Sequence, residues 1–226
     1  MKGVVEGIHT VPFGYVNAFL VTGERPILVD AGTPGGEQKI LKTIDAIGIT
    51  PEEVALIVVT HGHTDHFGSV DRLKELTGAP VAIHRRDVEA LQNGTMKLRP
   101  RTILGRVFTL FGQEGEMVPE FVTNGPEILI DGELSLTEFG IDGTIIPTPG
   151  HTAGSISVWL STGEAIAGDL LMAIFNRKKP GWPIFADDLE QVRASVAALL
   201  SRSPTRIYLG HGGPFTPESV RKLLEY

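Results

Sequence analysis

The sequence predicts an α/β (α+β) fold in which a single domain takes up residues 1–226. Three observations support this prediction. Short apolar segments of strand length alternate with longer segments whose apolar residues recur at helical spacing. The length of 226 residues is within the range of one domain, and 42% hydrophobic against 21% charged residues is typical of a globular protein. No low-complexity linker divides the chain.

The first part of the chain predicts four strands and three helices. Each predicted strand is a short apolar run between turn-forming residues, and each predicted helix carries its apolar residues on one face. Ser69 lies where the N-cap of the second helix belongs. We expect strands at 15–21, 27–30, 54–60 and 80–84, and helices at 36–47, at 69–76 and from 85 to about 91.

A segment at about 94–124 interrupts this alternation. Its apolar residues at 104, 107, 108 and 111 have the spacing of a short amphipathic helix. We expect this segment to be an insertion that covers the substrate. After it, the pattern predicts a helix at 189–200 and strands at 127–130, 144–147, 155–160, 165–167 and 206–209, of which 155–160 and 165–167 form a hairpin.

Composition and charge exclude several functional classes. The absence of Cys excludes Cys-based zinc fingers, iron–sulfur proteins, disulfide scaffolds and cysteine nucleophiles. The formal net charge is −7, whereas a nucleic-acid-binding protein usually carries a positive charge, so we expect no nucleic-acid partner. The first residues lack the apolar run of a signal peptide, and no apolar run approaches the roughly 20 residues of a membrane helix. We therefore expect a cytoplasmic protein with no membrane partner.

Three of the seven histidines lie in one hexapeptide, His61-Gly62-His63-Thr64-Asp65-His66. In a chain of this composition, three His and one Asp at these fixed offsets would arise by chance with a probability on the order of 0.0003. The hexapeptide follows a predicted strand, so a tight loop can direct several of its side chains to one point. His61 and His63, two residues apart in an extended segment, would share a face. Imidazole and carboxylate groups are ligands of zinc, iron and manganese.

Three further candidate ligands follow predicted strands later in the chain. His151, Asp169 and His211 each come directly after a glycine, and an apolar strand precedes each glycine. Each of them is therefore expected at the C-terminal end of a strand, where loops on a rigid frame carry functional residues. Any one of them alone is explained as a satisfied polar residue in a turn. The repeated context, together with the hexapeptide, favours one shared site.

These motifs resemble the full metal-binding set of the metallo-β-lactamase-fold hydrolase superfamily. The similarity includes the hexapeptide at 61–66, His151 in a Pro-Gly-His-Thr turn, Asp169 in Gly-Asp, and His211 in Gly-His-Gly. Asp30, in Leu-Val-Asp-Ala-Gly, resembles the first motif of that family. The resemblance implies a four-layer αββα sandwich, in which helices flank two mixed β-sheets and metal ions bind at one edge.

The resemblance also implies a role for each residue. His61, His63 and His151 would bind a first metal ion, and Asp65, His66 and His211 a second. Asp169 would bridge the two ions. Asp30 would orient a ligand from behind, with an ordinary strand-end or turn residue as the alternative interpretation. The implied cofactors are two divalent metal ions, with zinc preferred and iron or manganese left open.

The resemblance further implies a hydrolase in which a hydroxide that bridges the two metals cleaves an ester, a thioester or a lactone. Short glyoxalase II-like and lactonase-like enzymes are the most similar branch in size. Asp65 would be catalytic, accepting or shuttling a proton beside the hydroxide. Asp169 argues against a true β-lactamase, since those enzymes generally lack the bridging carboxylate. A phosphodiesterase, a mononuclear iron dioxygenase or redox enzyme, and a non-catalytic metal-binding scaffold stay open as alternatives.

The expected partner is a small-molecule substrate, and the basic residues of the middle segment suggest an anionic one. Arg99 and Arg101 would contact its carboxylate or phosphate, with a solvated charged face as the alternative. Phe108 would line an apolar pocket, with core packing or a homodimer interface as alternatives. Trp182, in the loop after Asp169, would form another pocket wall unless it simply packs.

Overall fold

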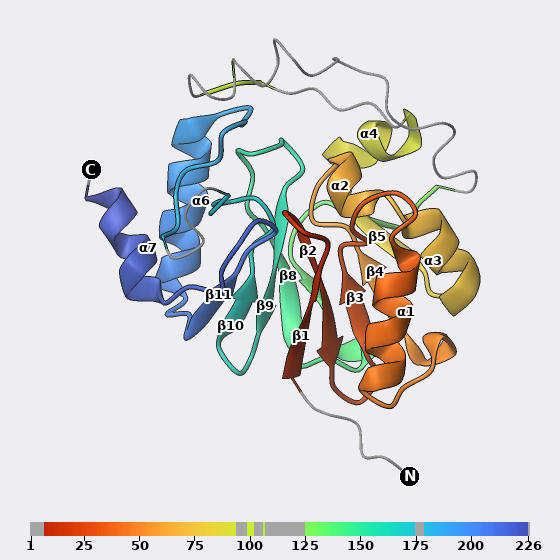
Figure 1. Cartoon of the computed structure of the whole chain (residues 1–226). Coiled ribbons are helices and arrows are strands. Elements are labelled where there is room, and N and C mark those ends of the chain that lie inside the picture. The colour runs from red at the N-terminus through yellow and green to blue at the C-terminus, as the bar shows by residue number, and fades with distance from the viewer. Residues whose placement is uncertain (1–6, 94–98, 102–105, 107–124, 175–178, 226) are drawn as a thin grey trace.

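Two β-sheets lie face to face in the computed structural model, and helices cover both outer faces (Figure 1). The structure describes residues 7–93, 99–101, 106, 125–174 and 179–225. Most of the predicted insertion at about 94–124, including the expected helix and Phe108, lies outside these residues. No helix in the described ranges combines the length and the apolar character needed to cross a membrane.

The first sheet has six strands, which are neighbours in the order in which they follow along the chain. The first three strands pair antiparallel and the last three join them in parallel, so this sheet is mixed. Its strands are β1 (Gly7–Pro12), β2 (Asn17–Thr22), β3 (Ile27–Val29), β4 (Leu56–Val58), β5 (Val81–His84) and β6 (Ile128–Ile130).

The second sheet has five strands in the order β11-β10-β9-β8-β7. Only β10 and β11 pair in parallel, and the other neighbours pair antiparallel, so this sheet is also mixed. Its strands are β7 (Leu134–Ser135), β8 (Gly143–Pro147), β9 (Ile156–Leu160), β10 (Glu164–Ile166) and β11 (Arg206–Tyr208).

The helices lie on the two outer faces and at the edge where the site forms. α1 and α3 cover the first sheet, α6 and α7 cover the second, and α2 and α4 lie toward one end of the sheets (Figure 1). Their bounds are α1 (Glu37–Ala46), α2 (Thr64–Phe67), α3 (Val70–Thr77), α4 (Val88–Asn93), α6 (Leu189–Ser201) and α7 (Pro217–Leu224), with 3-10 turns at Pro51–Glu53, Arg85–Asp87 and Thr137–Phe139.

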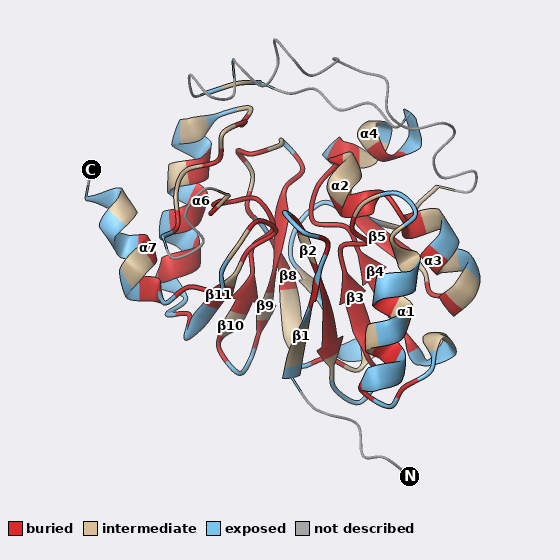
Figure 2. Cartoon of the chain, viewed as in Figure 1, coloured by how far each residue is buried: buried red, intermediate tan, exposed pale blue. Residues whose placement is uncertain are grey.

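Side-chain alternation along the strands builds the four layers. In β3, Leu28 packs in a cluster with Ile40 and Ile44 of α1, whereas Ile27 and Val29 pack in a cluster shared with the second sheet. In β10, Ile166 joins the cluster between the sheets, and Ala165 joins a third cluster with residues of α6. Three apolar cores therefore separate four layers, and most residues of the central strands are buried (Figure 2).

The strands and helices expected in the described part of the chain are present, and their ends differ from the prediction by no more than two residues. One exception is α4, which begins after the 3-10 turn Arg85–Asp87 instead of at residue 85. Four elements were not predicted: β1, β7, α2 and α7. β1 is an edge strand with only one buried residue, and β7 is two residues long, so neither has a clear apolar pattern.

The predicted N-cap role of Ser69 is wrong. Ser69 immediately precedes α3, as predicted, but within the described residues its side chain makes no capping bond to that helix. Instead, its Oγ donates a hydrogen bond to the carbonyl of Thr33 at 2.7 Å and accepts one from the backbone N–H of Gly36 at 2.9 Å. Ser69 therefore joins the start of α3 to the start of α1.

Candidate metal centre

The site forms where strands of both sheets end. β3 and β4 are parallel neighbours, so the loops that begin at Asp30 and His61 leave the first sheet at the same edge. β8, β10 and β11 run in one direction because β9 is antiparallel to both β8 and β10. The loops with His151, Asp169 and His211 therefore leave the second sheet at one edge.

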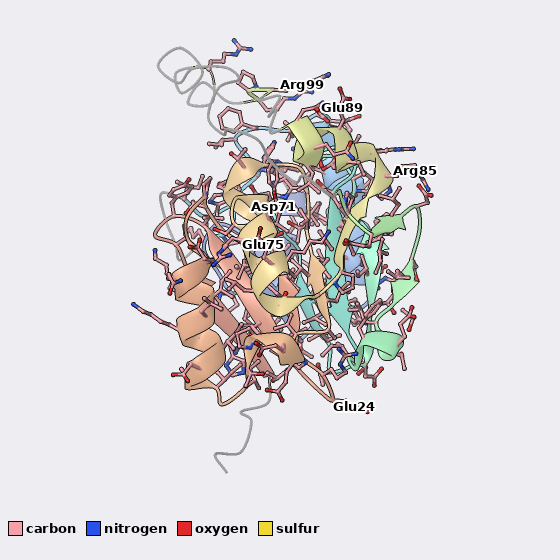
Figure 3. All side chains as sticks on the ribbon, turned by 90° about the vertical axis from the view of Figure 1, so that its right-hand side faces the viewer. Glu24, Asp71, Glu75, Arg85, Glu89 and Arg99 are labelled. Atoms are coloured by element: carbon pink, nitrogen blue, oxygen red, sulfur yellow. The ribbon has the colours of Figure 1, made fainter. Side chains whose placement is uncertain are left out.

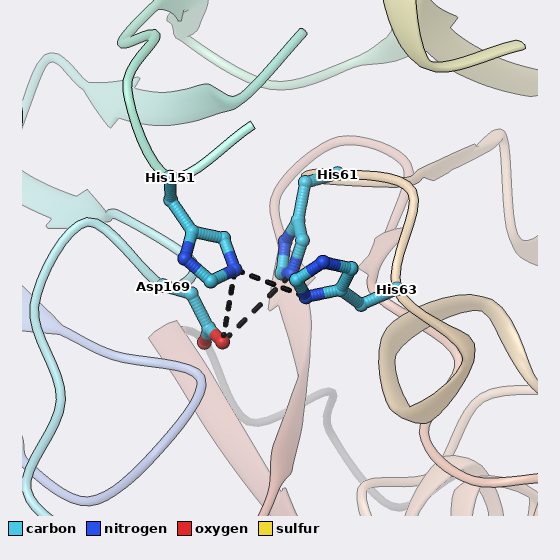
Figure 4. Close-up of side chains that lie close together, drawn as sticks. All are labelled: His61, His63, His151 and Asp169. Atoms are coloured by element: carbon cyan, nitrogen blue, oxygen red, sulfur yellow. Dashed lines mark hydrogen bonds and ion pairs between the residues drawn. The ribbon is translucent and has the colours of Figure 1, made fainter. Parts of the chain in front are cut away.

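One group of side chains contains His61, His63, His151 and Asp169 (Figure 4). One ligand atom from each residue lies within 4.8 Å of the others, and all four residues are buried. Nε2 of His151 is 3.0 Å from Nδ1 of His63. Oδ2 of Asp169 is 3.8 Å from Nε2 of His61 and 3.6 Å from Nε2 of His151. Three imidazoles and one carboxylate thus converge on a common point.

A second group contains Asp65, His66 and His211, whose ligand atoms also lie within 4.8 Å of one another. Nε2 of His211 is 3.5 Å from Oδ2 of Asp65. Asp169 contacts this group as well: its Oδ1 is 3.3 Å from Nε2 of His66, and its Oδ2 is 3.2 Å from Nε2 of His211. Asp169 therefore lies between the two groups.

The outer ring nitrogens of four histidines are held by oxygen acceptors. Nδ1 of His151 donates to the carbonyl of Phe185 at 2.8 Å, and Nδ1 of His211 donates to the carbonyl of Tyr15 at 2.9 Å. The other two are Nδ1 of His61, 3.0 Å from Oγ1 of Thr60, and Nδ1 of His66, 2.7 Å from Oδ2 of Asp30. A proton on Nδ1 leaves Nε2 free to bind a cation, so these contacts select the tautomer that a metal needs.

Asp30 is fully buried and lies behind His66 and His61. Besides the contact with His66, its Oδ1 accepts from the backbone N–H of Thr60 at 2.8 Å, and its Oδ2 accepts from the Thr60 hydroxyl at 2.9 Å. Its φ of +62° is in the left-handed region, which Asp tolerates better than most residues. The structure therefore places Asp30 directly behind the candidate ligands.

Several buried polar atoms at this point make no hydrogen bond. Across the described residues, Nε2 of His61, Nε2 of His66 and Oδ1 of Asp169 are buried without a hydrogen bond. Native proteins seldom leave such atoms unsatisfied, and a bound cation would satisfy all three. Imidazole and carboxylate donors without thiolates match zinc, iron or manganese. The residues present therefore fit divalent metal ions.

Comparison with known proteins decides the family. The model of the metallo-beta-lactamase superfamily matches residues 11–211. The chain belongs to this superfamily. A probable metallo-hydrolase of Methanocaldococcus jannaschii is 30% identical over 205 residues, which cover 88% of this chain and 89% of that protein. A probable metallo-hydrolase of Bacillus subtilis is 26% identical, over 96% of this chain and 88% of its own length.

Solved structures of the superfamily have the same fold. The crystal structure of the BLEG-1 B3 metallo-beta-lactamase matches with a TM-score of 0.72 at 20% identity, covering 96% of this chain and 97% of that one. The Rm3 metallo-beta-lactamase matches with a TM-score of 0.68 at 19% identity, covering 99% and 88%. The predicted αββα sandwich of the superfamily is thereby confirmed.

In this superfamily member the metal-free site has two kinds of histidine. Burial lowers the pKa of His61 and His63 well below the usual value. Burial also opposes protonation of His66, but the carboxylates of Asp169, Asp30 and Asp65 outweigh it and raise the pKa of His66 well above the usual value. Burial alone would raise the pKa of Asp169, yet His211 and His66 hold it well below its usual range. The same carboxylate of Asp169 raises the pKa of His211, so the pKa shifts of His66 and His211 both reflect the negative charge that gathers at this point.

Glycines before two candidate ligands allow the loops to approach. A Cβ atom on Gly210 would lie 2.4 Å from Oδ1 of Asp169 and 2.5 Å from Cε1 of His66. A Cβ atom on Gly168 would lie 2.8 Å from the Thr60 hydroxyl oxygen. The loops can come this close only because a glycine precedes Asp169 and His211, since any side chain there would clash with the neighbouring loop.

The predicted substrate contacts lie in different surroundings. Arg99 lines a cavity of about 220 Å³ beside His63, and its Nε is 3.2 Å from Oδ1 of Asp187. Figure 3 shows Arg99 at the same end of the molecule as Glu89, opposite Glu24. The guanidinium of Arg101 instead donates to the backbone carbonyls of residues 186 and 187.

Trp182 makes packing contacts. Its ring lies under the guanidinium of Arg193, 4.5 Å from ring centre to Cζ, and it packs against the apolar cluster of α6 and the second sheet. Phe108 lies outside the described residues.

The sequence analysis did not predict two residues that lie at the site, Tyr15 and Asp87. Tyr15 stacks on His211 with ring centroids 5.8 Å apart and planes 11° apart, while its side chain remains 55% exposed. Asp87 is buried between two of the ligand-bearing loops. Neither residue lies in a motif of His and Asp, and the only local sign of Asp87 is its place three residues past the end of β5.

Proposed function

We propose that this member of the superfamily is a dinuclear metal-dependent hydrolase that cleaves an ester, a thioester or a lactone. The observation that carries the proposal is the position of Asp169, whose carboxylate lies within 3.8 Å of histidine nitrogens from both groups. A carboxylate in that position is suited to bridge two cations. The names of the relatives from Methanocaldococcus jannaschii and Bacillus subtilis, both probable metallo-hydrolases, support the reaction class.

The proposed cofactors are two divalent ions, with zinc preferred. His61, His63 and His151 would hold one ion, Asp65, His66 and His211 the other, and Asp169 both. Such a pair supplies Lewis acidity and lowers the pKa of a bound water toward about 7. Two ions beside only two carboxylates, Asp65 and Asp169, leave excess positive charge, which favours a substrate that develops an oxyanion.

Asp65 is the proposed proton carrier. It is less buried than the other six candidate ligands, and its Oδ2 is 3.5 Å from Nε2 of His211. A carboxylate at the mouth of the site accepts a proton from water and passes it to a leaving group. No serine or cysteine nucleophile is needed for this chemistry.

The proposed substrate is a small molecule with an anionic group away from the scissile bond. The cavity beside His63 is lined by two arginines, Arg86 and Arg99, and by three acidic residues, Asp87, Glu89 and Asp187. Arg99 faces Asp187, whereas the exposed guanidinium of Arg86 has no ion-pair partner among the described residues. A carboxylate or phosphate in this cavity would lie within reach of Arg86 while the reacting group remains near His63.

Metal analysis and a substrate panel test the proposed function. We expect about two zinc ions per wild-type chain, fewer in Asp169→Asn, and hydrolysis of thioesters or lactones that depends on the metal. The panel includes a phosphodiester and a β-lactam. One iron per chain with oxygen consumption, exclusive cleavage of the phosphodiester or the β-lactam, or metal binding without any hydrolysis would each overturn the proposal.

A further inference from the structure

Asp87 connects two of the three loops that carry the first group of candidate ligands. It ends the 3-10 turn after β5, and only 5% of it is exposed. Its Oδ2 accepts from the backbone N–H of Gly62 at 2.8 Å, between His61 and His63. Its Oδ1 accepts from the backbone N–H of Gly154 at 2.9 Å, three residues after His151.

The carboxylate of Asp87 accepts a third hydrogen bond. The hydroxyl of Thr152 donates to Oδ2 of Asp87 at 2.6 Å. Burying a carboxylate is costly unless hydrogen bonds compensate it, and here three donors from two loops do so. The carboxylate and the loops therefore stabilise each other: the loops supply the three donors that the buried carboxylate needs, and both loops share this one acceptor group.

Close packing leaves these loops little freedom around Asp87. A Cβ atom on Gly154 would lie 2.4 Å from Oδ1 of Asp87, and one on Gly62 would lie 2.6 Å from Cβ of Ala90 in α4. Any larger residue at either position would displace the loop or the carboxylate. The two glycines thus permit short N–H···O contacts that a side chain would prevent.

We propose that Asp87 is a positioning residue for the first metal ion. By holding Gly62 and Gly154 to one carboxylate, it brings His61 and His63 close to His151. Figure 4 shows these three rings beside one another. The three hydrogen bonds of Asp87 go to loop donors and not to candidate ligand atoms, and the residue also lines the cavity beside His63. The proposal rests on the proposed function, because it assigns Asp87 to the metal site of that hydrolase.

The substitution Asp87→Asn disrupts the hydrogen bonds of Asp87 to the two loops with little change in side-chain volume. An amide has one acceptor oxygen, so its NH₂ group must face at least one of the N–H donors. We expect zinc affinity at the first group to fall about 10- to 100-fold, the range seen for groups that orient metal ligands, while the second group retains its affinity. Competition with a chromophoric chelator measures both affinities, and the visible spectrum of the cobalt-substituted protein reports the geometry of the first site.

Control variants separate positioning from general stability. Asp45→Asn removes an exposed carboxylate on α1 and should leave both affinities unchanged. Thr152→Val deletes one of the three donors and should give a smaller loss of affinity, while Thr152→Ser keeps the hydroxyl and should restore it. If Asp87→Asn fails to fold by circular dichroism, the Thr152 pair decides the matter.

The outcomes distinguish this proposal from the proposed function. An Asp87→Asn protein that binds zinc at the first group with wild-type affinity and an unchanged cobalt spectrum overturns the positioning role, even if its melting temperature falls. Equal zinc affinity in Thr152→Val and Thr152→Ser also overturns it. A wild-type chain that binds no zinc overturns both proposals.

Discussion

The carboxylate of Asp30 lies 2.7 Å from Nδ1 of His66, and both side chains are fully buried. Asp30→Asn leaves one acceptor oxygen for donors that now use two, so its NH₂ group must face either Nδ1–H of His66 or the backbone N–H of Thr60. Asn tolerates the left-handed backbone at this position. We expect zinc affinity at the second group to fall about 10- to 100-fold. Chelator competition measures it. Wild-type affinity in Asp30→Asn would show that the contact does not orient the ligand.

The stability of the metal-free protein should pass through a maximum near neutral pH. His61 and His63 have folded pKa values below the usual 6.5, so below that pH the unfolded chain binds more protons and the free energy of unfolding falls. His66 has a folded pKa well above 6.5, so its stabilising proton is lost as the pH rises through that raised value.

Thermal unfolding in the presence of a chelator, between about pH 5 and 9, measures this profile. The zinc-loaded protein is the control, and we expect it to lose less stability on the alkaline side because metal ions replace the protons. A melting temperature of the metal-free protein that rises steadily over the whole range would contradict the opposed shifts of these histidines.

Ser69→Ala should destabilise the fold by about 1–2 kcal/mol, because it removes the hydroxyl that joins Thr33 to Gly36. Urea unfolding measures the change as a lower midpoint at an unchanged slope. Ser201→Ala is the matched control: its hydroxyl is exposed and bonds within α6, so we expect a change within about 0.5 kcal/mol. Equal effects of the two substitutions would contradict the connecting role of Ser69.

Gly210→Ala should disturb the candidate metal site without a large loss of stability elsewhere. The added Cβ would lie 2.4 Å from Oδ1 of Asp169, so the carboxylate or the loop must move. We expect zinc affinity to fall by at least about tenfold, in line with other changes around metal ligands. Gly132→Ala, with open space around its Cβ, should bind zinc normally. Isothermal titration of both variants checks this, and equal affinities would contradict it.

Much of the fold was predictable because its strands are short apolar runs with clear ends. Alternation placed Leu28 and Ile57 on one face and Val29 and Val58 on the other, and packing then followed. The elements that escaped prediction have weak patterns. β1 buries one residue, and β7 has two residues in all. The family and its sandwich were also predictable, since five motifs along the chain carry the resemblance.

The roles of the basic residues near the site were far less predictable from the sequence. The predicted substrate contact of Arg101 stays a prediction, and nothing in the sequence indicated that its guanidinium bonds to backbone carbonyls 85 and 86 residues further along the chain. Basic residues close in sequence therefore took different roles according to what folded against them. The predicted contacts of Arg99 and the ligand roles of the seven His and Asp residues stay predictions until metal and substrate are tested.

By itself, the sequence determined which side chains are candidates for metal binding, because His and Asp at strand ends after glycine form a local pattern that can be read along the chain. Only the tertiary structure decided what holds them in place. The donors to Asp87 come from residues 25, 65 and 67 positions away, and those to Asp30 from 30 and 36 positions away. Such contacts depend on which strand ends of the two sheets lie beside each other. A local pattern of residues does not predict contacts between residues so far apart in the sequence.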